Sequence, residues 1–200
     1  MAGIKSGHTV GEAMSRIDET RPFIPLKIAV LAMSDTRSLA EDNSGSTLVE
    51  RIEQAGHVVA DRQIVRDDVE EIRTWLRAWI ADPAVDVVIT TGGTGFTGRD
   101  VTPEAVEPLF EKRMDGFSTA FHMVSHAKIG SSTIQSRATA GVAGATFIFC
   151  LPGSPGACKD AWDEILVHQL DYRYRPCNFV EIMPRLDEHL RRPKAQGASA

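Results

Sequence analysis

The chain has 200 residues, the length of one domain with short ends, and 42% of its residues are apolar and 24% charged. This balance is typical of a globular protein and excludes a disordered chain, a collagen-like fibre and a coiled coil. The formal charge of -5 argues against binding to duplex nucleic acid or an anionic membrane surface, and no apolar run is long enough to cross a membrane.

The two ends of the chain are polar and lack sustained periodicity. We therefore expect a flexible arm over residues 1–22, a single domain over 23–190 and a flexible tail over 191–200. The N-terminus has no apolar core of a secretion signal. The sequence holds three cysteines, Cys150, Cys158 and Cys177. Without any Cys-x-x-Cys pair they are expected to be reduced thiols, neither a disulfide framework nor a zinc site, which places the protein in the cytoplasm.

Short β-branched runs alternate with helical patterns along the middle of the chain. In chain order they predict a strand over 27–33, a helix over 48–55, a strand over 57–65, a helix over 69–80, a strand over 85–90, helices over 102–110 and 117–127, a strand over 146–152 and a helix over 154–170. Strands that alternate with helices imply right-handed crossovers. The expected fold is a three-layer α/β/α sandwich with a mostly parallel sheet.

The helix predicted over 69–80 carries two local signals. Asp67 and Glu70 form an Asp-x-x-Glu pattern typical of a capping box, so Asp67 is expected to cap this helix, although a capping carboxylate can also face a ligand. Trp75 and Trp79 share one helix face, which favours a place in the core or in a subunit contact over a cofactor site.

Ligands of an open parallel sheet bind beyond the carboxyl ends of its strands. Four segments follow the predicted strands at that edge: Ser34, Asp35 and Arg37; Arg66, Asp67 and Asp68; Thr90 to Asp100; and Leu151 to Ala157. The third contains Gly92, Gly93, Thr94 and Gly95, a run that can expose successive backbone amides to an oxyanion, usually a phosphate. The simpler alternative is a tight turn between strand and helix.

The glycine run matches neither the P-loop nor the Gly-x-Gly-x-x-Gly pattern, which disfavours a nicotinamide-dependent oxidoreductase. Asp100 makes the site more than an anion cradle, because a carboxylate next to bound phosphate needs a cation between them, and Mg²⁺ commonly binds one or two carboxylates plus substrate phosphates. Asp67 is the candidate second acid. Arg37 and Arg99 are either phosphate partners or surface arginines.

Three further features bear on the site. The turn Pro152-Gly153-Ser154 opens a helix and suits a second anionic or carbonyl group, so the ligand is expected to be elongated. Ser136 and Arg137 belong to a polar segment that can reach this ligand. His122 and His126 have helical spacing but no third ligand, which favours a surface or interface pair over a zinc site.

Taken together, TTGGTGFTGRDVTPEA, LPGSPGA, SSTIQSRA and the Ser34-Asp35 pair resemble the MoaB/MogA family of molybdenum cofactor biosynthesis, from about Phe23 to Phe179. RPCNF near the end resembles the B-type branch. The resemblance implies a molybdopterin-binding fold and transfer of an adenylyl group from Mg²⁺-ATP to molybdopterin, with release of pyrophosphate. It also implies a homotrimer or homohexamer and contacts with other enzymes of the pathway.

By the same resemblance, Asp67 and Asp100 are the functional aspartates that place Mg²⁺, and Ser136-Arg137 matches a polar motif near the pterin. Because Asp68 follows Asp67 directly, the sequence leaves open which of these two acids faces the ligand. The residues expected to bind molybdopterin or ATP are Ser34, Asp35, Arg37, Thr91, Gly92, Gly93, Thr94, Gly95, Arg99, Ser136, Arg137, Pro152, Gly153 and Ser154. A non-catalytic protein that binds or carries molybdopterin remains the alternative.

Overall fold

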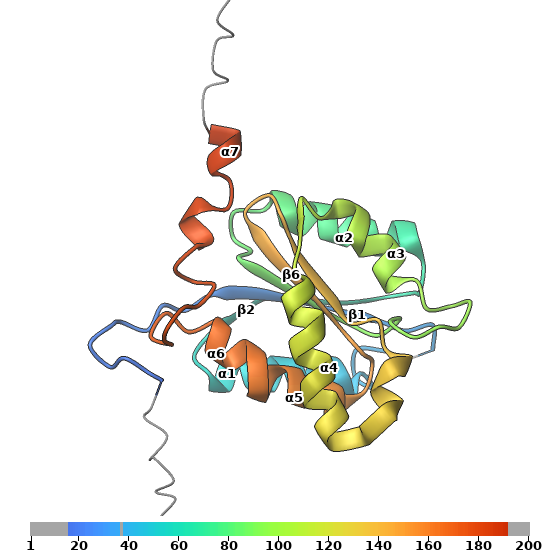
Figure 1. Ribbon diagram of the computed structural model, residues 1–200. Helices are drawn as coiled ribbons and strands as arrows, with labels where there is room; N and C mark the ends of the chain where they lie inside the picture. The colour runs from blue at the N-terminus through green and yellow to red at the C-terminus, as the bar shows by residue number, and fades with distance from the viewer. Residues whose placement is uncertain (1–15, 37, 192–200) are drawn as a thin grey trace, which may run out of the picture.

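A six-stranded sheet forms the middle layer of the structure, a computed structural model that describes residues 16–36 and 38–191 (Figure 1). The strands are β1 (Lys27–Met33), β2 (Val58–Val65), β3 (Val87–Thr91), β4 (Lys112–Arg113), β5 (Thr139–Ala143) and β6 (Thr146–Leu151). Their order is β2-β1-β3-β6-β5-β4, in which β2, β1, β3 and β6 are parallel, and β5 runs antiparallel to both β6 and β4. The expected three-layer sandwich with a mostly parallel sheet is confirmed.

Helices cover both faces of the sheet. They are α1 (Asn43–Gln54), α2 (Val69–Ala81), α3 (Thr102–Val106), α4 (Asp115–Ile129), α5 (Pro155–Ala161), α6 (Val167–Gln169) and α7 (Glu188–Arg191), with the 3-10 helices η1 (Glu107–Leu109), η2 (Gly130–Gln135) and η4 (Met183–Arg185) and the π-helix η3 (Trp162–Leu166). Figure 1 shows α2 and α3 on one face and α1, α4, α5 and α6 on the other.

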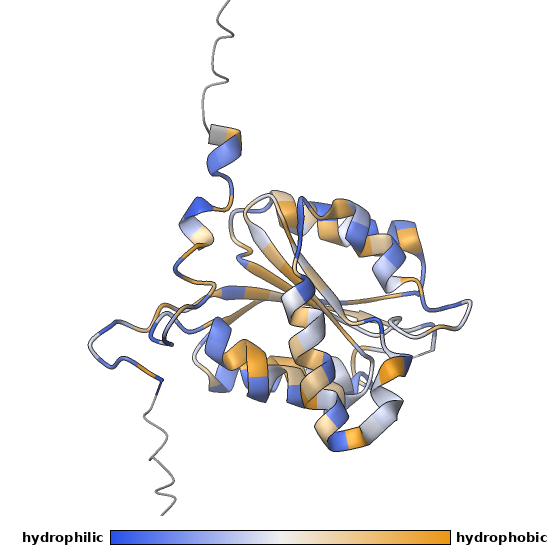
Figure 2. Cartoon of the chain, viewed as in Figure 1, coloured by the Kyte–Doolittle hydropathy of each residue, from blue (hydrophilic) through white to orange (hydrophobic). Residues whose placement is uncertain are grey.

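Two apolar clusters hold the layers together, one on each face of the sheet. Ile28 and Val30 of β1 pack with α1, α4 and α5, while Ala29 and Leu31 pack with α2 and α3. A strand buried on both faces must be apolar at every position, which is why these segments read as continuous runs. Figure 2 shows apolar strands between helices whose outer faces are polar. Trp79 is buried in the second cluster and Trp75 packs against it, so this pair belongs to the core.

The hairpin of β5 and β6 was not predicted, and neither was the short edge strand β4. The β5 sequence, TAGVA, is rich in small residues, so its strand conformation depends on pairing with β6 rather than on its own propensity. Gly144 begins the two-residue turn with φ +59°, the position that favours glycine in a type II′ hairpin. Gly141 lies so close to the Phe110 ring that an added Cβ would be 2.4 Å from it.

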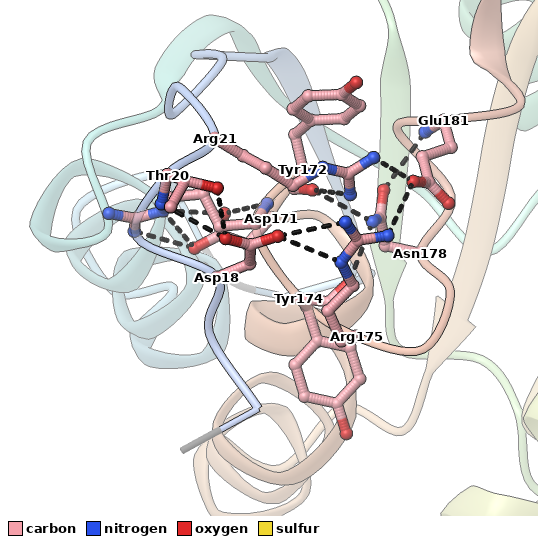
Figure 3. A network of polar contacts seen from close by, with 10 residues as sticks. Asp18, Thr20, Arg21, Asp171, Tyr172, Tyr174, Arg175, Asn178 and Glu181 are labelled. Atoms are coloured by element: carbon pink, nitrogen blue, oxygen red, sulfur yellow. Dashed lines mark hydrogen bonds and ion pairs between the residues drawn. The ribbon is translucent and has the colours of Figure 1, made fainter.

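Residues 16–25 lie along the segment that follows α6, although the sequence assigns residues 16–22 to the arm (Figure 3). Ile17 forms a β-bridge with Tyr174, and the Asp18 carboxylate accepts a hydrogen bond from Arg175 at 2.9 Å. Arg21 donates to the Tyr172 carbonyl at 2.7 Å and pairs with Glu181. Residues 1–15 of the expected arm and 192–200 of the expected tail lie outside the described residues.

The described cysteines are all free, as expected. Burial raises the pKa of both Cys150 and Cys158 to about 12, so these thiols stay protonated, while Cys177 is exposed. In the part of the chain that the structure describes, the helices are too short or too polar to cross a membrane.

One buried histidine makes the stability of this fold depend on pH. His57 is 6% exposed, its Nδ1 accepts from the Leu26 amide at 3.1 Å, and burial lowers its pKa to about 4. The unfolded chain therefore binds the additional proton below pH about 6.5, so stability falls as the pH drops from there to about 4, by about 3 kcal/mol in total. Urea unfolding of a His57→Gln variant is expected to lose this part of the pH dependence. A variant of the exposed His126, His126→Gln, should keep the wild-type profile, and equal profiles for the two variants would contradict the assignment.

Candidate functional site

A pocket of about 470 Å³ lies beyond the carboxyl ends of β1, β3 and β6. Three of the four predicted segments meet there directly and the segment after β2 contributes Asp67. The lining residues are Met33, Ser34, Asp35, Thr36, Asp42, Ser44, Asp67, Gly92, Gly93, Thr94, Gly95, Asp100, Gln135, Ser136, Pro152, Gly153 and Ser154. The described lining contains four aspartates and neither lysine nor arginine.

The two glycine turns touch at the floor of this pocket. Gly92 has φ +106°, and an added Cβ would lie 2.6 Å from the Met33 carbonyl oxygen. A Cβ on Gly153 would lie 3.1 Å from the Gly92 Cα. Both turns therefore need glycine for close approach, and the Gly92 amide is used in joining them because it donates to the Leu151 carbonyl at 3.0 Å.

Gly93 connects this floor to α3 and to the second acid. It has φ +62°, its carbonyl accepts from the Thr102 amide at 3.0 Å, and the Thr102 hydroxyl donates to the Gly92 carbonyl at 2.8 Å. A Cβ on Gly93 would be 2.8 Å from Oδ1 of Asp67, so the Asp67 carboxylate lies directly over this glycine.

The glycine loop does not offer all its amides to a ligand, which corrects the expected oxyanion nest. The Asp100 carboxylate accepts from the Thr97 amide at 2.8 Å and the Thr97 hydroxyl at 2.6 Å, and also from the Gly95 amide. Burial alone would raise the pKa of Asp100, but these hydrogen bonds bring it below its ordinary value. The loop thus closes on its own acid, which stays ionised at the pocket wall.

Asp68, not Asp67, caps α2. The Asp68 carboxylate accepts from the amides of Glu70 and Glu71, both at 3.0 Å, and the Glu71 carboxylate accepts from the Arg66 amide at 3.3 Å. The predicted cap at Asp67 is therefore wrong by one residue: Asp68 is the N-cap, and Glu71 reaches back to the Arg66 amide instead of to the amide of the cap itself, as it would in a capping box. This register leaves the Asp67 side chain free to line the pocket.

The pKa of Asp67 is raised, first by burial and then by the negative charges of Asp35 and Asp100, against the positive charge of Arg99, which lowers it. The other acids of the pocket have partners: Asp35 pairs with Arg99 at 2.8 Å, and the buried Asp42 caps α1 and pairs with Arg62 at 3.1 Å. Among the described residues, no salt bridge joins Asp67 to a lysine or arginine. Negative charge is thus in excess around Asp67, which is the electrostatic environment of a cation site.

The donor set fits Mg²⁺ bound together with phosphates. The described residues hold no group of three or more His, Cys, Asp or Glu side chains suited to a metal. Asp67 and Asp100 supply two carboxylates, and Mg²⁺ typically binds one or two carboxylates while substrate phosphates and water complete its shell. A pocket with this charge can hold a phosphorylated ligand only if cations accompany it.

The remaining predicted residues divide between the pocket and its supports. Ser154 lines the pocket and caps α5, since its hydroxyl accepts from the Ala157 amide at 3.2 Å. Thr91 is buried behind the pocket and donates to the Pro152 carbonyl at 3.0 Å. Arg99 lies beside the pocket, paired with Asp35, and Arg37 lies outside the described residues.

Several residues that line the pocket were not predicted from the sequence. Asp42 and Ser44 reach the pocket from the start of α1, which begins at Asn43, five residues before the apolar pattern. The signal was present as Asp42-x-Ser44-Gly45, a cap pattern in which the Gly45 amide donates to Asp42 at 2.9 Å. Met33, Thr36 and Gln135 also line the pocket without a distinctive motif.

The two histidines of α4 differ in their surroundings. His122 lies with Nδ1 2.7 Å from the Ser118 carbonyl oxygen and Nε2 3.0 Å from that of Ser136. His126 is exposed and lines an apolar groove with Met123 and Ile134. Among the described residues, no group of three or more His, Cys, Asp or Glu side chains suited to a metal includes either histidine.

Comparison with known proteins gives consistent matches. Residues 29–172 match the family model of a probable molybdopterin binding domain. Molybdenum cofactor biosynthesis protein B of Escherichia coli K12 is 50% identical over 157 residues, 78% of this chain and 92% of the relative. The Bacillus subtilis protein of the same name is 40% identical over 151 residues, 75% of this chain and 89% of the relative.

Solved structures agree with these matches. A crystal structure of molybdenum cofactor biosynthesis protein B has a TM-score of 0.75 and 37% identity, covering 84% of this chain and 99% of that one. The tungsten cofactor synthesizing protein MoaB from Pyrococcus furiosus has a TM-score of 0.67 and 32% identity, covering 82% and 98%.

Proposed function

Because this chain belongs to the MoaB/MogA family of molybdenum cofactor biosynthesis proteins, we propose that its pocket binds molybdopterin and transfers an adenylyl group to it from ATP. One observation above all supports the proposal. Asp67 and Asp100 line one pocket with the two glycine turns, and the described lining has no cationic side chain to balance them. A phosphate-binding site of this composition requires a metal ion.

The proposed reaction needs no side-chain nucleophile, because a substrate phosphate attacks. An oxygen of the terminal molybdopterin phosphate attacks the α-phosphorus of ATP, the bond to the β-phosphate oxygen breaks, and pyrophosphate leaves. Asp67 and Asp100 would hold Mg²⁺, which offsets the negative charge of the crowded phosphates. The chain contributes alignment: the Gly92 turn and the Gly153-Ser154 turn hold the two substrates close enough to react.

The direct test is a turnover assay with purified protein, molybdopterin and ATP, in the presence of Mg²⁺ or of EDTA. We expect adenylylated molybdopterin and pyrophosphate in equal amounts, and only with Mg²⁺. Tight molybdopterin binding with no turnover would refute the adenylyl transfer and support the non-catalytic carrier instead. Absence of molybdopterin binding would refute both.

A further inference from the structure

We propose that Arg137 is a positioning residue that does not itself bind the substrate phosphate. It holds residues 94–100, called the acidic loop here because they carry Asp100, in the conformation that places the Asp100 carboxylate at the pocket. The inference rests on the proposed function and assigns to Arg137 a different role from the one the resemblance implies. It follows from where the guanidinium group is directed in the structure.

Arg137 is bonded to the acidic loop at both ends. Its backbone amide donates to the Thr94 carbonyl at 2.8 Å, and its side-chain Nε donates to the Gly95 carbonyl at 2.8 Å. The Nη2 atom donates to the Asp100 carbonyl at 2.9 Å, and Nη1 pairs with Glu104 of α3. A planar guanidinium can make these three side-chain contacts at fixed angles, whereas a lysine ammonium cannot.

These contacts hold the loop that positions the Asp100 carboxylate. The Gly95 and Asp100 carbonyls are held by one rigid group, and within the loop the amides of Gly95 and Thr97 hold the Asp100 carboxylate. The guanidinium also lies 5.4 Å from the centre of the Phe96 ring. Removing Arg137 would free both ends of the segment at once, so the Asp100 carboxylate would lose its place at the pocket wall.

Arg137 does not line the main pocket, although it donates to the carbonyls of two residues that do, Gly95 and Asp100. Ser136 lines both the main pocket and a neighbouring one of about 460 Å³, whereas Arg137 lines only the neighbouring one, together with Glu104 and Arg113. Its side chain is 26% exposed, and all three of its nitrogens already donate to the protein. An arginine used for substrate phosphate would keep one edge of its fork free.

The position of Arg137 is itself set from α4. The Ser136 carbonyl lies 3.0 Å from Nε2 of His122, and Nδ1 of the same ring lies 2.7 Å from the Ser118 carbonyl. The imidazole therefore joins the segment before β5 to the helix beside it. A rigid helix thus supports Ser136 and Arg137, and these support the acidic loop.

A double-mutant cycle with Asp100 tests the proposal. We expect Arg137→Gln to lower kcat by about 10- to 100-fold, the usual cost of losing a group that supports a metal ligand. Its Kd for molybdopterin without Mg²⁺ should stay within about threefold of wild type. Because Arg137 acts through Asp100, the double variant with Asp100→Asn should be no slower than Asp100→Asn alone.

Two conservative variants separate charge from geometry. Arg137→Lys keeps the positive charge but loses the fork, so it is expected to be as slow as Arg137→Gln, and a direct phosphate contact would instead be largely restored. Glu104→Gln weakens the contact of Arg137 Nη1 outside the main pocket, so it should lower kcat by a smaller factor than Arg137→Gln does. Arg113→Gln, a control arginine of the neighbouring pocket paired with Glu107, should match wild type.

Additive losses in the cycle, recovery by lysine, or weaker Mg²⁺-free molybdopterin binding would each overturn the proposal. If the wild type shows no adenylyl transfer, the proposed function fails, and the double-mutant cycle is then measured as the gain in molybdopterin affinity that Mg²⁺ produces. Arg137→Gln and Asp100→Asn should each remove this gain, and the double variant should lose no more than Asp100→Asn alone. Should Arg137→Gln fail to fold, as judged by circular dichroism, Glu104→Gln takes its place in the cycle.

Discussion

Asp67→Asn is expected to lower kcat for adenylyl transfer by about 10³-fold, equivalent to about 4 kcal/mol of transition-state stabilisation. Asn keeps the shape of the side chain but removes the charge. In the structure, burial and the charges of Asp35 and Asp100 raise the pKa of Asp67. The negative charges among these causes also attract Mg²⁺, and the substitution removes the carboxylate that would bind it.

The neighbouring acid provides the control. Asp68→Asn makes the same chemical change one residue along the chain, where the side chain is exposed and caps α2. Asn caps helices about as well as Asp, so we expect an unchanged free energy of unfolding and kcat within about twofold of wild type. Steady-state kinetics over a range of Mg²⁺ concentrations compare the two. A larger loss with Asp68→Asn than with Asp67→Asn would show that the wrong acid has been assigned to the metal.

This pair also illustrates what sequence alone cannot resolve. Asp67-x-x-Glu70 and Asp68-x-x-Glu71 are equally good capping boxes, and they differ by one residue in where α2 begins. The choice depends on where the chain turns from β2 into α2, so that Asp68 meets the first amides of the helix and Asp67 faces the pocket, and the two identical patterns do not determine this. An error of one residue in the cap exchanges the roles of two adjacent acids, so a correct fold does not by itself identify which acid lines the pocket.

The sheet was predictable where its strands are buried on both faces, because burial demands a continuous apolar run. β1, β3 and β6 satisfy this condition, and the parallel topology then brings their carboxyl ends to one pocket. β5 was not predictable, since its small residues form a strand only when β6 offers a partner. The contacts of residues 16–22 were hidden for a related reason, as Asp18 and Arg175 are 157 positions apart.

The largest structural effect is expected from Gly92→Ala, which should lower the free energy of unfolding by about 2–5 kcal/mol. Alanine at φ +106° adopts an unfavourable left-handed conformation, at about 1–2 kcal/mol, and overpacking typically adds about 1–3 kcal/mol. The new Cβ would meet the Met33 carbonyl oxygen at 2.6 Å. Met33 is the last residue of β1 and pairs with Val65 of β2, so its backbone has little room to move.

Gly98→Ala is the matched control, because it lies in the same loop region with no positive φ and no atom within 4 Å of the added Cβ. In urea unfolding, its free energy of unfolding should stay within about 0.5 kcal/mol of wild type. The strain of Gly92→Ala can be relieved only by moving its turn away from β1, and that turn touches the Gly153 turn. Molybdopterin binding should therefore weaken for Gly92→Ala even where the protein remains folded. Equal midpoints and equal affinities for the two variants would mean that the turns do not meet as they do here.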